Sequence, residues 1–69
     1  MNLIINGETR ECRVRTIREL VEIELEADDV PARGVAVAVN GRVVPRAGWH
    51  DAALAPGDKI EIVRALPGG

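Results

Sequence analysis

The sequence predicts an α+β fold in which a mixed sheet of about four to five strands is covered by one main helix. Two Asn-Gly pairs, Asn6-Gly7 and Asn40-Gly41, each separate apolar runs in the manner of a β-hairpin turn. A helix-start pattern begins at Thr16, between the two hairpins, and one more strand-like run follows Asp58 near the end of the chain.

The composition fits a single small domain. The chain has 69 residues and a net charge of −2, and Trp49 is its only aromatic residue, so the core must be aliphatic. Cys12 is the only cysteine and cannot form an internal disulfide. We expect no signal peptide, no membrane-spanning segment and a cytoplasmic location.

Residues 1 to 14 are expected to form the first hairpin. Apolar side chains alternate along the first strand, at Met1, Leu3 and Ile5. Asn6-Gly7 suits a type I′ turn, since Asn and Gly tolerate positive φ. The return strand is expected to extend to Val14, with Cys12 and Val14 at alternate positions.

Thr16 and Glu19 have the spacing of a capping box, so a helix should begin at Ile17. Its apolar face recurs at i, i+3 and i+4, at Ile17, Leu20 and Val21. Glu24 interrupts this pattern, and we expect the helix to end, kink or repack near residues 24 to 27.

The second half begins with a loop at residues 28 to 34, followed by an apolar run at 35 to 39 that is typical of a strand covered on both faces. A second Asn-Gly turn leads to a short strand at 42 to 44, which Pro45 should end.

Residues 47 to 55 contain Trp49 and Leu54 and are expected to form an irregular or single-turn helical crossover. A turn at 55 to 58 should precede a last strand at 59 to 65, with Ile60 and Ile62 on one face. This order of elements is the β-grasp plan, in which the last strand is central and adjacent to the first. We therefore expect a β-grasp domain at 1 to 65 and a flexible tail at 66 to 69.

The chain offers little catalytic chemistry of its own. It has no serine, no glycine-rich phosphate loop and no cluster of metal ligands. His50 is expected to be an idle surface residue, and Cys12 a small packed hydrophobe rather than a nucleophile. Charges are mixed rather than gathered on a basic face, which argues against nucleic-acid binding.

One reactive group remains, the α-carboxylate of Gly69. α-Carboxyl groups have an ordinary pKa of about 3.3 to 3.7, so this group would be ionised at neutral pH and could attack the α-phosphate of ATP. Gly68 has no Cβ and suits a narrow channel, while Pro67 favours an extended Leu66. These three residues are expected to thread into a partner enzyme.

Four stretches resemble the ThiS family, the sulfur carriers of thiamine biosynthesis. They are T-I-R-E-L-V at 16 to 21, V-A-V-A-V-N-G-R-V-V-P-R-A-G-W at 35 to 49, L-A-P-G-D-K-I-E-I-V at 54 to 63, and G-G at 68 and 69. The ordered set covers most of the chain and is specific, whereas a P-G-D before a strand is a weak motif alone.

The resemblance implies a ubiquitin-like carrier that is not an enzyme and holds no cofactor. A ThiF-like adenylyltransferase would adenylate Gly69 with ATP and magnesium. A cysteine desulfurase relay would then convert it to a thiocarboxylate, and thiazole synthase (ThiG) would receive the sulfur.

Candidate docking residues lie near the tail. With Ile60 and Ile62 facing the helix, Val63 and Ala65 should face the opposite side of the sheet. Arg46 is a docking candidate or else a solvated partner of an acidic residue.

Three alternatives remain at the level of sequence. The small subunit of molybdopterin synthase (MoaD) is another β-grasp carrier that ends in Gly-Gly, although it is usually longer and lacks the V-P-R-x-x-W block. The chain could also be a ubiquitin-like protein modifier, or an interaction module in which the glycines are incidental.

Overall fold

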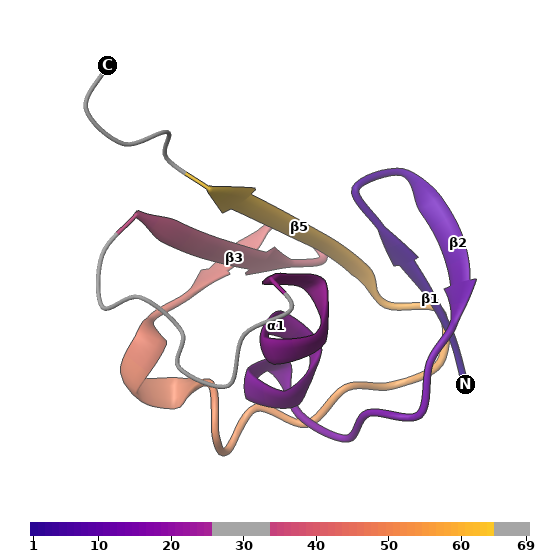
Figure 1. The fold of residues 1–69 in the computed structure, drawn as a ribbon, viewed down its shortest axis with the longest axis horizontal. Helices are drawn as coiled ribbons and strands as arrows, with labels where there is room; N and C mark the ends of the chain where they lie inside the picture. Colours follow the sequence, from indigo (N-terminus) through magenta and orange to yellow (C-terminus); the bar gives the residue numbers. More distant parts are fainter. Residues whose placement is uncertain (26–33, 65–69) are drawn as a thin grey trace.

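The computed structural model describes residues 1–25 and 34–64. In chain order, these residues form β1 (Asn2–Ile5), β2 (Glu8–Glu11), α1 (Ile17–Leu25), β3 (Val35–Val39), β4 (Arg42–Val44), the 3₁₀ helix η1 (Arg46–Gly48) and β5 (Lys59–Arg64). The strands form one mixed sheet in the order β2-β1-β5-β3-β4, and α1 lies across one of its faces (Figure 1). The predicted α+β class and the central last strand are confirmed.

Both predicted Asn-Gly turns are present. Asn6 and Gly7 have φ values of 49° and 83°, and Asn40 and Gly41 have values of 51° and 85°. Asparagine and glycine adopt this left-handed region at lower cost than other residues, which is why these dipeptides close tight hairpins. The turns connect the antiparallel pairs β1–β2 and β3–β4.

The return strand of the first hairpin is shorter than predicted. β2 ends at Glu11, which pairs with Asn2, the first residue of β1. The amide of Cys12 still donates to the carbonyl of Met1 at 2.8 Å, but Val14 lies beyond the start of β1 and has no strand to pair with. Val14 is nonetheless buried, so the alternation expected from the sequence reflects core packing rather than strand geometry.

The helix begins at Ile17, as predicted. The amide of Glu19 donates to Thr16 Oγ1 at 3.3 Å, while the Glu19 carboxylate accepts from the amide of Arg15 at 3.2 Å rather than from that of Thr16. This differs from a standard capping box in one bond, because the Glu19 side chain bonds to the amide of the residue before the cap residue Thr16. α1 is described as far as Leu25, and residues 26 and 27 of the interval in which the helix was expected to end lie outside the described residues.

The core lies between α1 and the sheet. Its helical contribution is the predicted apolar face, and strands β1, β3 and β5 contribute as well. The buried hydrophobic residues are Leu3, Ile5, Val14, Ile17, Leu20, Val21, Val37, Trp49, Leu54 and Ile60. Trp49 follows η1, and its indole Nε1–H donates to the carbonyl of Val44 at 2.9 Å, which allows the polar end of this ring to be buried.

The prediction that residues 35 to 39 are covered on both faces is wrong. Val37 is 1% exposed and faces α1, whereas its neighbour Ala36 is exposed on the other side of β3. A single helix covers only one face of this sheet, and no other described residue packs over the second face at Ala36. Residues 35 to 39 are all apolar because small alanines occupy the positions on the second face, and not because both faces of β3 are buried.

The crossover and the last turn agree with the sequence analysis. Pro45 precedes η1, and Trp49 and Leu54 hold the segment against the core. The amide of Asp58 donates to the carbonyl of Ala55 at 3.1 Å and closes the turn before β5. Predicted strand residue Ala65, the predicted tail at 66 to 69, and residues 28 to 33 of the predicted loop lie outside the described residues.

Candidate functional site

β5 connects the core to the segment that the sequence analysis singled out. It is paired on both edges, in parallel with β1 and antiparallel to β3. Its pairing with β3 continues to Arg64, which lies opposite Val35. The last described residues therefore belong to a strand in the middle of the sheet, between β1 and β3.

Side chains of β5 alternate between the two faces, as expected for a strand. Ile60 is 1% exposed and Ile62 is half-buried, and both pack with the core. Val63 points the other way and is 61% exposed. Of the predicted docking residues on this strand, Val63 is on the open face, while Ala65 lies outside the described residues.

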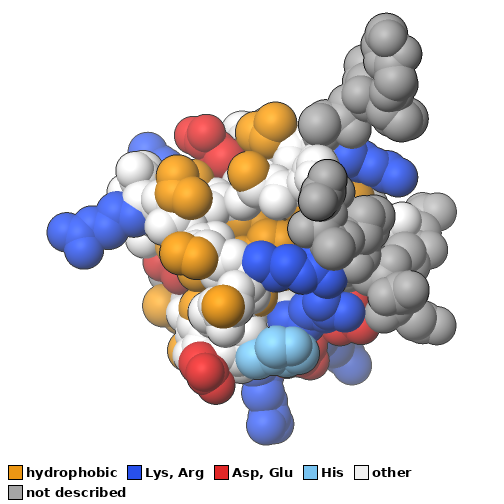
Figure 2. Space-filling model, turned by 90° about the vertical axis from the view of Figure 1, so that its left-hand side faces the viewer, with side chains coloured by type: hydrophobic (Ala, Val, Ile, Leu, Met, Phe, Trp, Pro, Cys, Tyr) orange, Lys and Arg blue, Asp and Glu red, His pale blue; other side chains and the backbone are white. Residues whose placement is uncertain are grey.

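Val63 is part of an apolar strip that crosses three strands. Its cross-strand neighbour is Ala36 on β3, and Ala38 on the same face lies opposite Val43 on β4, which is 74% exposed. Directly opposed residues of antiparallel strands share a face. We call Ala36, Ala38, Val43 and Val63 the open-face strip. Surface hydrophobic side chains among charged ones are also visible in Figure 2, which views the molecule from one side.

Arg46 lies on η1 and is half-buried. Its guanidinium carbon is 5.4 Å from the centroid of the Trp49 ring, a cation–π distance. Because Trp49 is fixed in the core, this contact gives Arg46 a defined position rather than a freely solvated one. The sequence analysis left Arg46 between a docking contact and a solvated ion-pair partner, and the ring contact was not foreseen.

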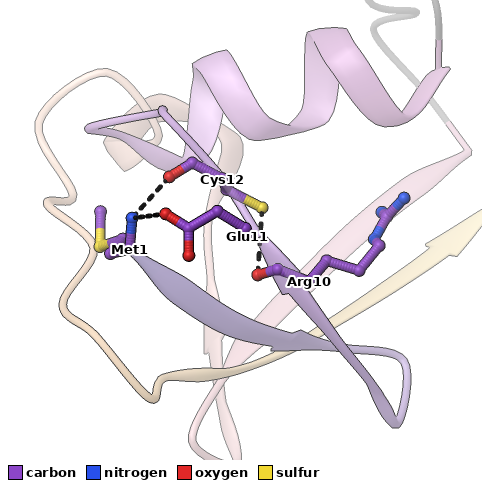
Figure 3. A network of polar contacts seen from close by, with 4 residues as sticks. All are labelled: Met1, Arg10, Glu11 and Cys12. Atoms are coloured by element: carbon purple, nitrogen blue, oxygen red, sulfur yellow. Dashed lines mark hydrogen bonds and ion pairs between the residues drawn. The ribbon is translucent and has the colours of Figure 1, made fainter.

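Cys12 is half-buried and packs against the core, as predicted. Its thiol lies 3.7 Å from the carbonyl of Arg10, and the neighbouring carbonyl of Cys12 accepts from the amino group of Met1 at 2.8 Å (Figure 3). The amino group also pairs with Glu11, and Arg10 pairs with Glu24 on α1. These charges are engaged in holding β2 to its neighbours, which supports a structural role for this region.

His50 is exposed in the loop after Trp49. Within residues 1–25 and 34–64, no three His, Cys, Asp or Glu side chains gather as a metal site, and no helix is long and apolar enough to cross a membrane.

Two contacts of β5 were missed by the sequence analysis, which assigned Asn6 and Asn40 to turns only. The carboxamide of Asn6 accepts from the amide of Ile62 at 2.9 Å and donates to the carbonyl of Ile62 at 3.3 Å. The carboxamide of Asn40 accepts from the amide of Lys59 at 3.0 Å. Asn6 and Ile62 are 56 positions apart, so no local pattern could have predicted this contact.

Comparison with known proteins gives one family. The model of the ThiS family matches residues 3–69. Among curated proteins, the sulfur carrier protein ThiS of Escherichia coli K12 is 31% identical over 70 residues, with all of both chains covered. A thiazole synthase of Paramagnetospirillum magneticum is 39% identical over 69 residues, but this chain spans only 20% of its length.

Solved structures agree with the fold. The crystal structure of a thiamine biosynthesis protein (ThiS) from Geobacter metallireducens superposes with a TM-score of 0.70 at 25% identity, over the whole of both chains. A solution structure of a thiamine biosynthesis protein from the same organism gives 0.77 at 26% identity and covers all of this chain and 88% of that one.

Proposed function

Because this chain belongs to the ThiS family and is a sulfur carrier of thiamine biosynthesis rather than an enzyme, we propose that it carries sulfur as a thiocarboxylate on Gly69. The observation that supports this most is the extent of the match. The family model reaches residue 69, and the Escherichia coli carrier is matched over its whole length. The two glycines at 68 and 69 thus belong to the matched region.

The first step of the proposed reaction is adenylation. An oxygen of the Gly69 carboxylate attacks the α-phosphorus of ATP, and pyrophosphate leaves as the bond to its bridging oxygen breaks. We assign ATP and magnesium to a ThiF-like adenylyltransferase, since metal ions and cationic side chains in an active site stabilise the charge that develops on the phosphates. The carrier supplies only the nucleophile.

The second step introduces sulfur. A cysteine desulfurase relay supplies the sulfur as a persulfide, a thiol reductant cleaves it to the level of sulfide while being oxidised to a disulfide, and this sulfur attacks the acyl carbon of the adenylate. A carbon–sulfur bond forms, the bond to AMP breaks, and the thiocarboxylate remains. Thiazole synthase is the proposed acceptor, and support comes from the relative of that name, which contains a region 39% identical to this chain.

The proposed docking surface is the open-face strip together with Ala65 and Arg46. Val43 and Val63 are 74% and 61% exposed, and with Ala36 and Ala38 they form a contiguous apolar patch on the open face. A partner that covers them would gain apolar burial next to the segment that enters its active site. Leu66, Pro67 and Gly68 would then thread toward the nucleotide. A cytoplasmic location is part of this proposal.

Deletion of the gene tests the pathway. We expect a strain without it to require the thiazole precursor of thiamine for growth, and we expect the intact gene to restore growth. A gene that encodes the chain without Gly69 is the matched control and should not restore it. If the deletion strain instead grew without thiazole and lost its molybdoenzyme activity, the chain would serve the molybdopterin pathway and the proposal would be wrong.

A further inference from the structure

The side chain of Asn6 extends the hydrogen bonding of β5 past the end of β1. Backbone pairing between β1 and β5 covers only Ile4 with Lys59 and Ile5 with Ile60. The amide of Asn6 then donates to the carbonyl of Ile60 at 2.8 Å, and the Asn6 carboxamide bonds to both peptide groups of Ile62. A carboxamide has the donor and the acceptor of a peptide group, so it takes the place of the next strand residue.

The Asn6 side chain determines the last residue of β5 that is hydrogen-bonded on both edges of the strand. On its other edge, β5 pairs with β3 through Val37 with Ile62, Ala36 with Val63 and Val35 with Arg64. Among the residues that the structure describes, Ile62 is the last one on β5 bonded on the β1 side. Ile62 is seven positions before Gly69. Without the carboxamide, the strand end at residues 62 to 64 would be held by β3 alone.

We propose that Asn6 is a positioning residue for the reaction at Gly69. By fixing both peptide groups of Ile62, it holds the end of β5 in the sheet and fixes the point at which the chain departs toward the partner's active site. This inference rests on the proposed function. A strand end that is already ordered loses less conformational entropy when the partner binds, so the Asn6 contact should lower the concentration of carrier needed for half-maximal rate.

Asn40 provides a matched control within the same molecule. It also occupies the first position of an Asn-Gly turn, with φ of 51° against 49° for Asn6. Its carboxamide also makes two hydrogen bonds, from Lys59 and to Asp58, both at 3.0 Å. Those bonds hold the first residue of β5 and the residue before it, at the end opposite the tail. Glycine accepts positive φ, so Asn6→Gly and Asn40→Gly each remove a carboxamide and keep the turn.

The experiment measures adenylation by ATP–pyrophosphate exchange with a ThiF-like adenylyltransferase, at varied concentrations of each folded carrier. For Asn6→Gly we expect KM for the carrier to rise about three- to tenfold with kcat within about twofold of the wild type. Asn40→Gly should leave both constants within about twofold. Asn6→Asp keeps an acceptor for the Ile62 amide and loses the donor, so its KM should be intermediate.

Amide hydrogen exchange provides a readout that does not depend on the enzyme. Loss of the Asn6 carboxamide should speed exchange at Ile62 relative to Val21 in the core, whereas Asn40→Gly should speed it at Lys59 instead. The inference is overturned if Asn6→Gly leaves KM unchanged, or if both glycine variants raise KM equally, because the effect would then be general destabilisation. If the wild-type carrier supports no exchange at all, adenylation of Gly69 is refuted instead.

Discussion

Replacement of Val63 by a charged residue tests whether the open-face strip binds a partner. Val63 is 61% exposed, and burial of a whole valine side chain contributes about 1.5 kcal/mol, so covering the exposed part should contribute about 1 kcal/mol. A charge left in the interface adds an unfavourable desolvation term of about 1 kcal/mol or more. Val63→Glu and Val63→Lys should therefore each weaken binding at least about tenfold, since about 1.4 kcal/mol corresponds to a factor of ten.

The same exposure limits the expected loss of folding free energy to about 0.6 to 1.6 kcal/mol. The native state buries only about 0.4 of the Val63 side chain, so loss of this burial lowers the free energy of unfolding by about 0.6 kcal/mol. The lower β-propensity of a charged residue lowers it by up to about 1 kcal/mol more. For a domain of this size, about 1 kcal/mol shifts Tm by roughly 4 to 8 °C. The assay is isothermal titration calorimetry with the adenylyltransferase at a temperature where every variant is folded.

Ile23 supplies the control for this experiment. It is 60% exposed, almost the same as Val63, but it lies on α1, which covers the opposite face of the sheet. Ile23→Glu should leave binding unchanged. Equal affinity of the Val63 variants and the wild type would refute docking through the strip, and so would equal losses in the Val63 and Ile23 variants. A loss with only one sign of charge would indicate electrostatics rather than burial.

Three further predictions concern the cap, the core and the tail. Thr16→Ala removes the side-chain acceptor for the Glu19 amide and should destabilise the fold by about 1 kcal/mol, seen as a lower urea midpoint with an unchanged m-value. Trp49→Phe leaves the Val44 carbonyl without its indole donor in a partly buried setting, so we expect a loss of about 1 to 3 kcal/mol in the same titration. Deletion of Gly69 should leave Tm within about 4 °C of the wild type, because the sequence predicts that this residue belongs to a tail outside the β-grasp domain, and changes outside a core are usually within about 0.5 kcal/mol; a larger fall would mean that the glycine supports the core.

Features set by short-range chemistry could be predicted from the sequence. The Asn-Gly turns require positive φ, the Thr16 hydroxyl caps a helix three residues before Glu19, and Pro45 cannot donate to a strand ladder. Each depends on the residue and its close neighbours. The position of Val63 on the open face also followed from the alternation of a single strand.

Features set by distant parts of the chain could not be predicted in the same way. β2 ends at Glu11 because this residue already pairs with Asn2, the first residue of β1, so Val14 has no partner in the sheet. The sequence of the return strand does not reveal this register. Among the residues that the structure describes, α1 covers one face of the sheet, which leaves β3 open on the other face. The Asn6 carboxamide reaches Ile62 only because β5 is inserted beside β1, so its role in the candidate site became visible with the tertiary structure.

The intact mass of the chain, measured after reaction, tests the central claim most directly. The chain is incubated with the adenylyltransferase, ATP, magnesium and a sulfur donor, and fragmentation then locates any change. We predict a gain equal to the replacement of one oxygen by sulfur, confined to Gly69. An unchanged mass, with an enzyme that adenylates another carrier under the same conditions, would contradict the account, as would sulfur found on Cys12 instead.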